Sequence, residues 1–209
     1  PFAQGLILRS GNAALSVGPY ASNKTTSSCS GAPDSDLASL NGGNMPTIDA
    51  TYVKFDFIPS SDTLSFNFIY ASNEYGQFQC SYSDSCAFLL SDLTTGAVVN
   101  MAVIPGTNIR VNGLNIRDNT YAPECSSNNL AYFGSYNVGN PNSPTSFAGQ
   151  TVPMTAMATV NPTHMYRLKL VVADTGDDVF DSAVFIEGSS FFGVNCQNLI
   201  QMQAFLDTN

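Results

Sequence analysis

Four aspartates crowd one short segment near the end of the chain. Residues 173–181, between two strongly apolar segments, contain Asp174, Asp177, Asp178 and Asp181. Carboxylates on a turn suit Ca²⁺, which takes about six to eight hard oxygen ligands in a flexible geometry. The spacing is not that of an EF-hand loop, and Asp with Gly can simply make a turn whose charges face water. Two interpretations stay open, a calcium site and a solvated turn.

Two further acids, Glu74 and Asp84, extend this candidate site. Glu74 is one of three glutamates in the chain and directly follows an expected buried strand, where a charge needs a partner. It could join Asp84 and the 174–181 loop as a calcium ligand, or it could accept hydrogen bonds from backbone amides in a turn. A structural calcium ion is the one cofactor that the sequence suggests.

The five cysteines indicate disulfides rather than a zinc site. They form no CxxC pair, and the single histidine leaves no Cys/His set at zinc spacing. Cys80 and Cys86 flank a short Ser/Tyr/Asp loop and could pair, while Cys29 and Cys125 lie in loop-like sequence and could form a second pair. Cys196 is then left to pair between molecules or to remain a buried thiol.

Catalysis has little support in the sequence. His164 lies in a turn that opens a strand, and any Ser/His/Asp triad would depend on it alone because the chain has no Gly-x-Ser-x-Gly motif. Two carboxylates could serve a glycosidase, but there is no Trp on which a sugar could stack. We therefore expect no enzyme. Asn23 opens an Asn-x-Thr sequon and is a candidate glycosylation site.

The composition excludes several partners. Seven basic against sixteen acidic residues give a net charge of −9 in 209 residues, and the pI is near 4.1. Such a chain offers phosphate backbones and anionic membranes nothing to bind. No apolar run approaches the roughly 18–20 residues of a membrane helix. Ser, Thr, Asn and Gly replace the missing charge, which favours an extracellular location. Because residues 1–4 lack signal-peptide character, we expect a mature or trimmed form.

Alternating apolar residues predict an all-β chain. A strand is expected at residues 5–10, and residues 52–57 and 64–70, joined by the turn signal at 59–62, predict a hairpin with one buried face. Long polar segments follow at 11–46 and 105–148. The other expected strands cover 86–91, 98–104, 151–160, 165–173, 182–192 and 199–206. The pattern predicts a single domain, a β-sandwich of two packed, mainly antiparallel sheets with long Ser/Asn/Gly-rich loops.

Six short motifs together resemble a known family, the choice-of-anchor L domain. They appear in the family's order between residues 5 and 192: Gly5-Leu-Ile-Leu-Arg-Ser-Gly11, Gly18-Pro-Tyr20, Asp49-Ala50 before Val53-Lys-Phe-Asp-Phe57, Phe68-Ile-Tyr-Ala-Ser-Asn-Glu-Tyr75, Ile104-Pro-Gly-Thr107, and Asp181-Ser-Ala-Val-Phe-Ile-Glu187 before Ser190-Phe191. The resemblance implies a bacterial secreted or surface-attached protein with an adhesive theme.

The chain departs from this family pattern at both ends. It begins almost on the first strand and adds a C-terminal tail, so we divide it into a domain at 1–192 and a tail at 193–209. In the tail, one apolar face is formed by Ile200, Met202, Ala204 and Leu206. The tail could complete a neighbouring copy's sheet, with Cys196 locking the joint, or fold back as this domain's own last strand.

These observations predict an extracellular structural or adhesive protein. It would be a cell-surface adhesin module or a filament subunit assembled by strand donation, with copies of itself or another surface protein as partners. The alternative is a calcium-dependent module that binds a peptide or a glycan. A glycosidase is the third possibility.

Overall fold

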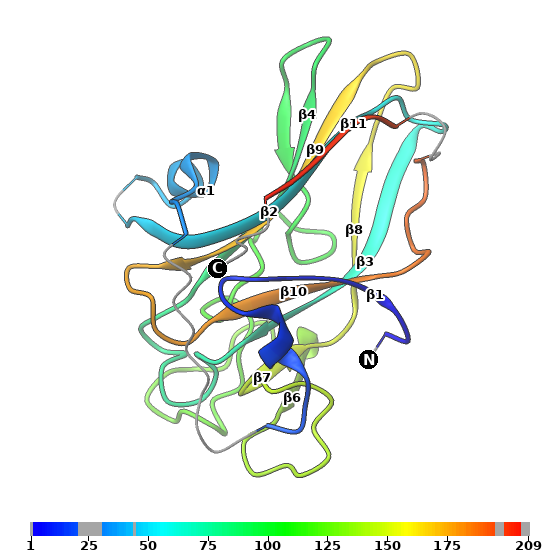
Figure 1. Cartoon of the computed structure of the whole chain (residues 1–209). Coiled ribbons are helices and arrows are strands. Elements are labelled where there is room, and N and C mark those ends of the chain that lie inside the picture. Colours follow the sequence, from blue (N-terminus) through cyan, green and yellow to red (C-terminus); the bar gives the residue numbers. More distant parts are fainter. Residues whose placement is uncertain (1, 21–30, 44, 195–198, 206–209) are drawn as a thin grey trace.

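A computed structural model describes residues 2–20, 31–43 and 45–194, together with the backbone of residues 199–205. Two antiparallel sheets pack face to face and make up most of its regular structure (Figure 1). The predicted β-sandwich is therefore confirmed.

The first sheet has six strands. Their order is β1-β10-β3-β7-β6, and β8 pairs with β3 beside this path. The strands are β1 (Gly5–Arg9), β3 (Thr63–Ser72), β6 (Phe133–Tyr136), β7 (Gly149–Thr151), β8 (Met154–Thr159) and β10 (Ser182–Glu187).

The second sheet has five strands in the order β11-β2-β9-β4-β5. Its strands are β2 (Thr47–Phe57), β4 (Ser85–Asp92), β5 (Val98–Asn100), β9 (Tyr166–Thr175) and β11 (Leu199–Phe205). The central strand β9 pairs with β2 at one edge and with β4 at the other, and its residues 170–173 are all buried.

The core lies between the sheets and follows from the alternation of each strand. Phe66 and Phe68 of β3 meet Phe88 of β4, with ring centroids 5.2 Å and 4.8 Å apart. All three side chains are buried. Burial of one such side chain contributes about 1.5–3 kcal/mol, so these contacts hold the two sheets together.

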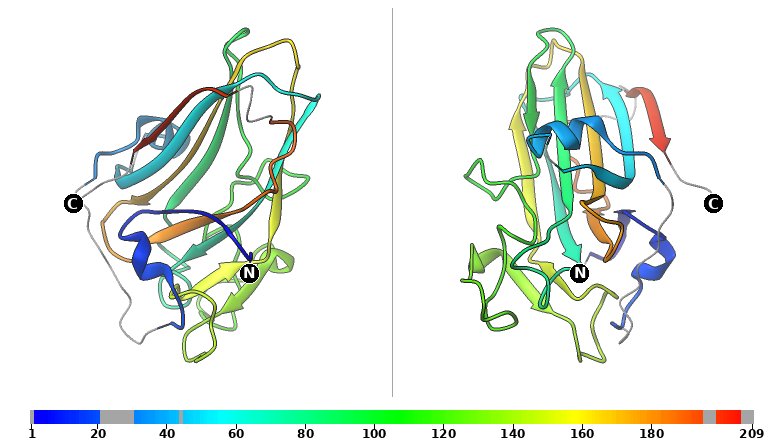
Figure 2. Two further views of the ribbon diagram at one scale, coloured as in Figure 1. Left: turned by 45° about the vertical axis from the view of Figure 1, so that its right-hand side comes forward. Right: turned by 90° about the vertical axis from the view of Figure 1, so that its left-hand side faces the viewer.

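Three short helices were absent from the sequence prediction: η1 (Ala13–Ser16), α1 (Ser35–Leu40) and η2 (Leu130–Tyr132). The Asp34 side chain caps α1 by accepting hydrogen bonds from the backbone N–H groups of Asp36 and Leu37. Leu37 packs on the outer face of the five-stranded sheet, over which α1 lies (Figure 2). A helix of this length is too short to show an apolar period of 3.6 residues.

The predicted hairpin of residues 52–57 and 64–70 is wrong. Both segments are strands, but β2 pairs with β9 and β11, whereas β3 pairs with β10, β8 and β7. The turn at 59–62 therefore carries the chain from one sheet to the other, and each strand buries its apolar face against the opposite sheet.

The predicted C-terminal strand is present at the edge of the five-stranded sheet. β11 runs antiparallel to β2, with Leu199 opposite Phe57 and Phe205 opposite Tyr52. In this single chain the tail thus folds back on its own domain. It does not lie beside β1, which ends the other sheet (Figure 2).

Candidate functional site

Four of the six predicted metal-ligating residues come together where the two sheets meet. Ser85 pairs with Ala173 between β4 and β9, so Asp84 and Asp174 form the next opposed pair. Asp181 directly precedes β10, and Glu74 lies two residues beyond the end of β3. All four side chains are buried. We call Glu74, Asp84, Asp174 and Asp181 the carboxylate cluster.

Arg9 supplies a buried positive charge beside the cluster. Its Nε donates to Asp181 Oδ2 at 2.8 Å, and both side chains are fully shielded from solvent. Its Nη1 donates to Ser16 Oγ at 3.2 Å, and the guanidinium lies 4.8 Å from the centre of the Phe147 ring. Arg9 thus joins Asp181 to η1 and to the ring of Phe147.

Asp84 is held by two donors from neighbouring strands. The Ser182 hydroxyl donates to Oδ2 at 2.6 Å, and the Thr175 N–H donates to Oδ1 at 3.2 Å. Burial raises the pKa of Asp84 well above its usual range, and the negative charges of Glu74 and Asp181 raise it further against these hydrogen bonds. Burial and the neighbouring negative charges thus both disfavour the charged form of Asp84.

Asp174 is the most isolated member of the cluster. Its side chain is fully buried, and neither carboxylate oxygen accepts a hydrogen bond. Burial, followed by the charge of Asp84, raises the pKa of Asp174 to about 10. Ser10 lies near enough to lower this pKa, but its hydroxyl donates to the Ser182 carbonyl instead. Asp49, also buried, adds to the negative surroundings.

The remaining two predicted ligands, Asp177 and Asp178, lie on the β9–β10 turn. Asp177 is exposed, and its Oδ1 accepts the Val179 N–H at 3.0 Å, which is the turn-making role left open by the sequence. Within the described residues, no three Asp, Glu, His or Cys groups are arranged to hold a metal ion as they stand. For the carboxylate cluster to bind calcium, its side chains would have to move so that their oxygens lie closer together.

The structure corrects the predicted disulfides. Cys80 bonds to Cys125, whereas Cys86 is a free, buried thiol in β4. The predicted Cys80–Cys86 pair is wrong because Cys86 points into the core with Phe88 and Leu90, and the Cys29–Cys125 pair is wrong because Cys125 is already bonded. Burial raises the pKa of Cys86 to about 12.

Several predicted residues lie outside the described part of the chain: Cys29, Asn23, Cys196 and Leu206. Ile200, Met202 and Ala204 belong to β11, of which the backbone is described. His164 does not face the carboxylate cluster. Its Nδ1 lies 2.8 Å from Asp92 Oδ2, and the pair joins the turn before β9 to the end of β4.

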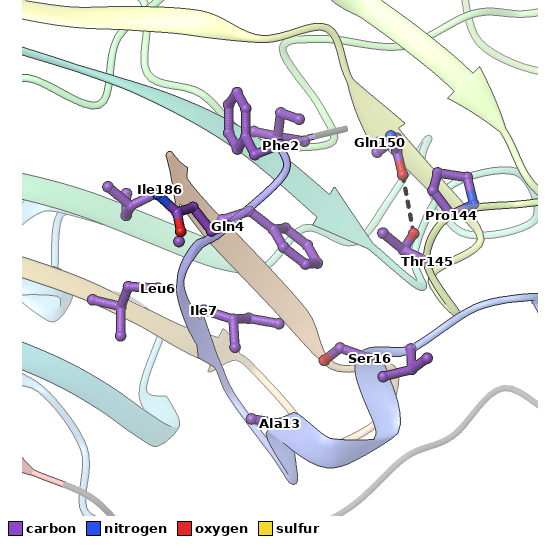
Figure 3. Close-up of a pocket in the computed structure, with 14 residues that line it drawn as sticks. Phe2, Gln4, Leu6, Ile7, Ala13, Ser16, Pro144, Thr145, Gln150 and Ile186 are labelled. Atoms are coloured by element: carbon purple, nitrogen blue, oxygen red, sulfur yellow. Dashed lines mark hydrogen bonds between the residues drawn. The ribbon is translucent and has the colours of Figure 1, made fainter. Parts of the chain in front are cut away.

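An apolar pocket of about 340 Å³ lies on the outer face of the six-stranded sheet (Figure 3). Ile7, Phe185 and Ile69 form one cross-strand row on its floor. The N-terminal segment and the loop before β7 form its walls, and the Thr145 hydroxyl donates to Gln150 Oε1 at 3.0 Å. This volume and lining suit an apolar group of a ligand.

The pocket borders the outer edge of β1, along which none of the described strands pairs. Gln4 C=O and Ser10 N–H bond to β10, so the even-numbered residues of this segment face that strand. The backbone N–H and C=O of Ile7 therefore point away from the sheet. An extended peptide could pair there and continue the apolar row of Ile7, Phe185 and Ile69.

Comparison with protein families identifies the fold. The sequence model of the choice-of-anchor L domain matches residues 1–192. The chain belongs to this family. The comparisons with curated proteins and with solved structures find no match. The choice-of-anchor L domain indicates a bacterial protein that is secreted or held at the cell surface. Among the described residues, no helix is long and apolar enough to cross a membrane.

The sequence interpretation missed three features of this choice-of-anchor L domain. Arg9 stands alone in an apolar strand, which was a signal that it needs a buried acidic partner. Phe180 interrupts the acidic loop and stacks on Phe78 of another loop. The floor of the pocket includes Ile7 and Phe185, which gave no separate signal because each lies in a short run of consecutive apolar residues.

Proposed function

We propose that this choice-of-anchor L domain is a structural and adhesive module that links to neighbouring copies at the bacterial surface by exchanging β11. The observation that carries the proposal is the position of β11, which is the edge strand of its sheet among the described strands and pairs along β2. The backbone hydrogen bonds between two paired strands are the same whether the strands belong to one chain or to two.

Strand exchange would also protect the edge of β2. Residues 52–57 of β2 pair with β11, and without it their N–H and C=O groups would form an open edge. Self-insertion and donation satisfy these groups equally. Donation then prevails where the concentration of chains at a surface exceeds the effective concentration of each chain's own tethered strand.

The open edge of β1 offers a second place for an extended segment of a partner. The row of Ile7, Phe185 and Ile69 favours an apolar side chain in the adjoining pocket. This chemistry supports a peptide ligand over a glycan. The buried carboxyl groups of Asp84, Asp174 and Asp181 cannot reach a sugar, which weighs against the glycosidase.

Truncation tests the assembly proposal. We expect light scattering and negative-stain microscopy to show multimers for the full chain at high concentration, and for a control that ends after Phe205 and so keeps β11. A chain ending after Val194 should stay monomeric and should bind a synthetic peptide of residues 199–205. Multimers that persist without β11, or a full chain that remains monomeric, would overturn the proposal.

A second candidate is a calcium-dependent binding module, favoured by the fully buried and unpartnered oxygens of Asp174. A cation that binds only the folded chain raises stability by about 4 kcal/mol at a thousandfold excess over Kd. We expect a higher melting temperature with calcium than with EDTA, and no difference for Asp174→Asn. Equal melting of the parent chain in both buffers would reject this candidate.

A further inference from the structure

A small cavity of about 160 Å³ opens beside Glu74, between the segment that follows β3 and the β9–β10 turn. Its lining consists of Glu74, Phe78, Tyr82, Asp177, Val179 and Phe180. The volume lies below the roughly 300–1,000 Å³ of pockets for whole drug-sized ligands. The cavity therefore suits one functional group rather than a whole sugar or peptide.

Three aromatic rings form one side of this cavity. Phe78 and Phe180 stack with centroids 4.7 Å apart, and Tyr82 meets Phe78 edge to face at 6.1 Å. Tyr82 is half exposed, so its ring stands at the mouth. Aromatic faces carry negative potential and attract cations within about 6 Å of the ring centre.

Phe180 reaches this position through an unusual backbone conformation. Its φ is 71°, in the left-handed region that bulky residues rarely adopt. This conformation places the ring of Phe180 on Phe78 while the next residue, Asp181, turns inward to Arg9. Strained backbone of this kind is found at binding sites, where the surrounding contacts hold it in place.

The charged residues of the lining determine whether a positively or a negatively charged ligand can bind. Glu74 is only 4% exposed and Asp177 is exposed, so one carboxylate lies deep and the other at the surface. Aromatic walls give a metal ion few oxygen ligands, and carboxylates repel anions. An organic cation suits both parts of the lining, because its charge can contact the carboxylates and its carbon atoms can contact the aromatic rings.

We infer that the cavity formed by Glu74, Phe78, Tyr82, Asp177 and Phe180 binds an alkylammonium group, either of a lysine side chain on a partner or of a free quaternary amine. The inference does not depend on strand exchange, but the cavity shares Glu74 with the candidate calcium site, so calcium and the organic cation would compete for this carboxylate. It adds a contact through which the domain would recognise basic partners.

Titration calorimetry with two probes tests the inference. Choline represents the quaternary amines, and Nα-acetyl-lysinamide represents a lysine side chain. We expect saturable binding of at least one probe in the millimolar range with EDTA present, and the tighter probe identifies the source. The uncharged isostere of choline, 3,3-dimethylbutanol, should not bind saturably. Absence of binding by both cations, or equal binding of the isostere, would overturn the inference.

Variants locate the binding. Glu74→Gln removes the deep charge, and Tyr82→Leu removes a half-exposed ring without touching the core. Each should weaken binding at least fivefold. Glu124→Gln changes the net charge by the same amount as Glu74→Gln at an exposed position outside the cavity and should leave binding unchanged. Equal binding by all three variants would contradict the assignment to this cavity.

Discussion

Arg9 and Asp181, 172 positions apart in the sequence, form a fully buried ion pair with 2.8 Å between Nε and Oδ2. The pair ties the first strand of the chain to the residue that opens β10, and it stands beside the carboxylate cluster. It therefore links the edge of the six-stranded sheet to the candidate site.

Removing Arg9 should be costly. In Arg9→Met the Asp181 carboxylate stays buried without its guanidinium partner, and loss of one member of a buried pair typically costs ~3–5 kcal/mol. Urea unfolding should show this loss. The double variant Arg9→Met/Asp181→Asn removes both charges and should recover part of it. A single variant as stable as the parent chain would contradict the buried pair.

Acid should weaken the contact between Asp92 and His164. Burial alone would raise the pKa of Asp92, but hydrogen bonds from His164 and from the N–H groups of Thr94 and Thr95 hold it well below its usual range. Because the pKa is lower in the folded than in the unfolded state, its contribution to stability is present above about pH 4 and is lost as the pH falls below that value.

Asp92→Asn provides the measurement for this contact. The difference in unfolding free energy between the parent chain and the variant should shrink between pH 4 and 2. A difference that stays constant down to pH 2 would show that the pKa of Asp92 is not lowered by folding.

The Cys80–Cys125 bond should stabilise the segment between β3 and η2. It closes a loop with a sequence separation of 45, for which the loss of unfolded-state entropy predicts about 4 kcal/mol. Cys80→Ala/Cys125→Ala should show this loss in chemical unfolding.

The free thiol of Cys86 should be unreactive in the folded chain. Because it is buried, it should resist alkylation by iodoacetamide until the chain unfolds. Rapid labelling of Cys86 in the native protein would contradict its placement in the core.

The strands could be predicted from the sequence better than their partners. Alternation located β2 and β3, but the turn at 59–62 looks the same whether it joins a hairpin or leads to the other sheet. Which sheet a strand joins depends on distant pairings, such as Lys54 of β2 with Lys169 of β9. No local pattern contains that information.

The candidate site was also only partly predictable, because a local pattern shows that a charge needs a partner but not which way each side chain faces. A charge beside an apolar strand signals a buried partner, and this reasoning found Glu74, Asp84 and the acidic loop. It could not separate Asp174 and Asp181, which face inward, from Asp177, which makes the turn. For the cysteines, closeness in sequence was misleading. Cys86 alternates with Phe88 and Leu90, which was a local sign that it faces the core.

Exchange of β11 can be tested most directly by a disulfide across the ladder. Lys54 lies opposite Gln203, so Lys54→Cys/Gln203→Cys, with Cys29 and Cys196 changed to Ser, can form a bond between β2 and β11. Strand exchange predicts a ladder of covalent multimers on non-reducing electrophoresis of the concentrated protein, absent from each single-cysteine control. A single cross-linked monomer band would show that β11 stays on its own chain and would contradict the proposal.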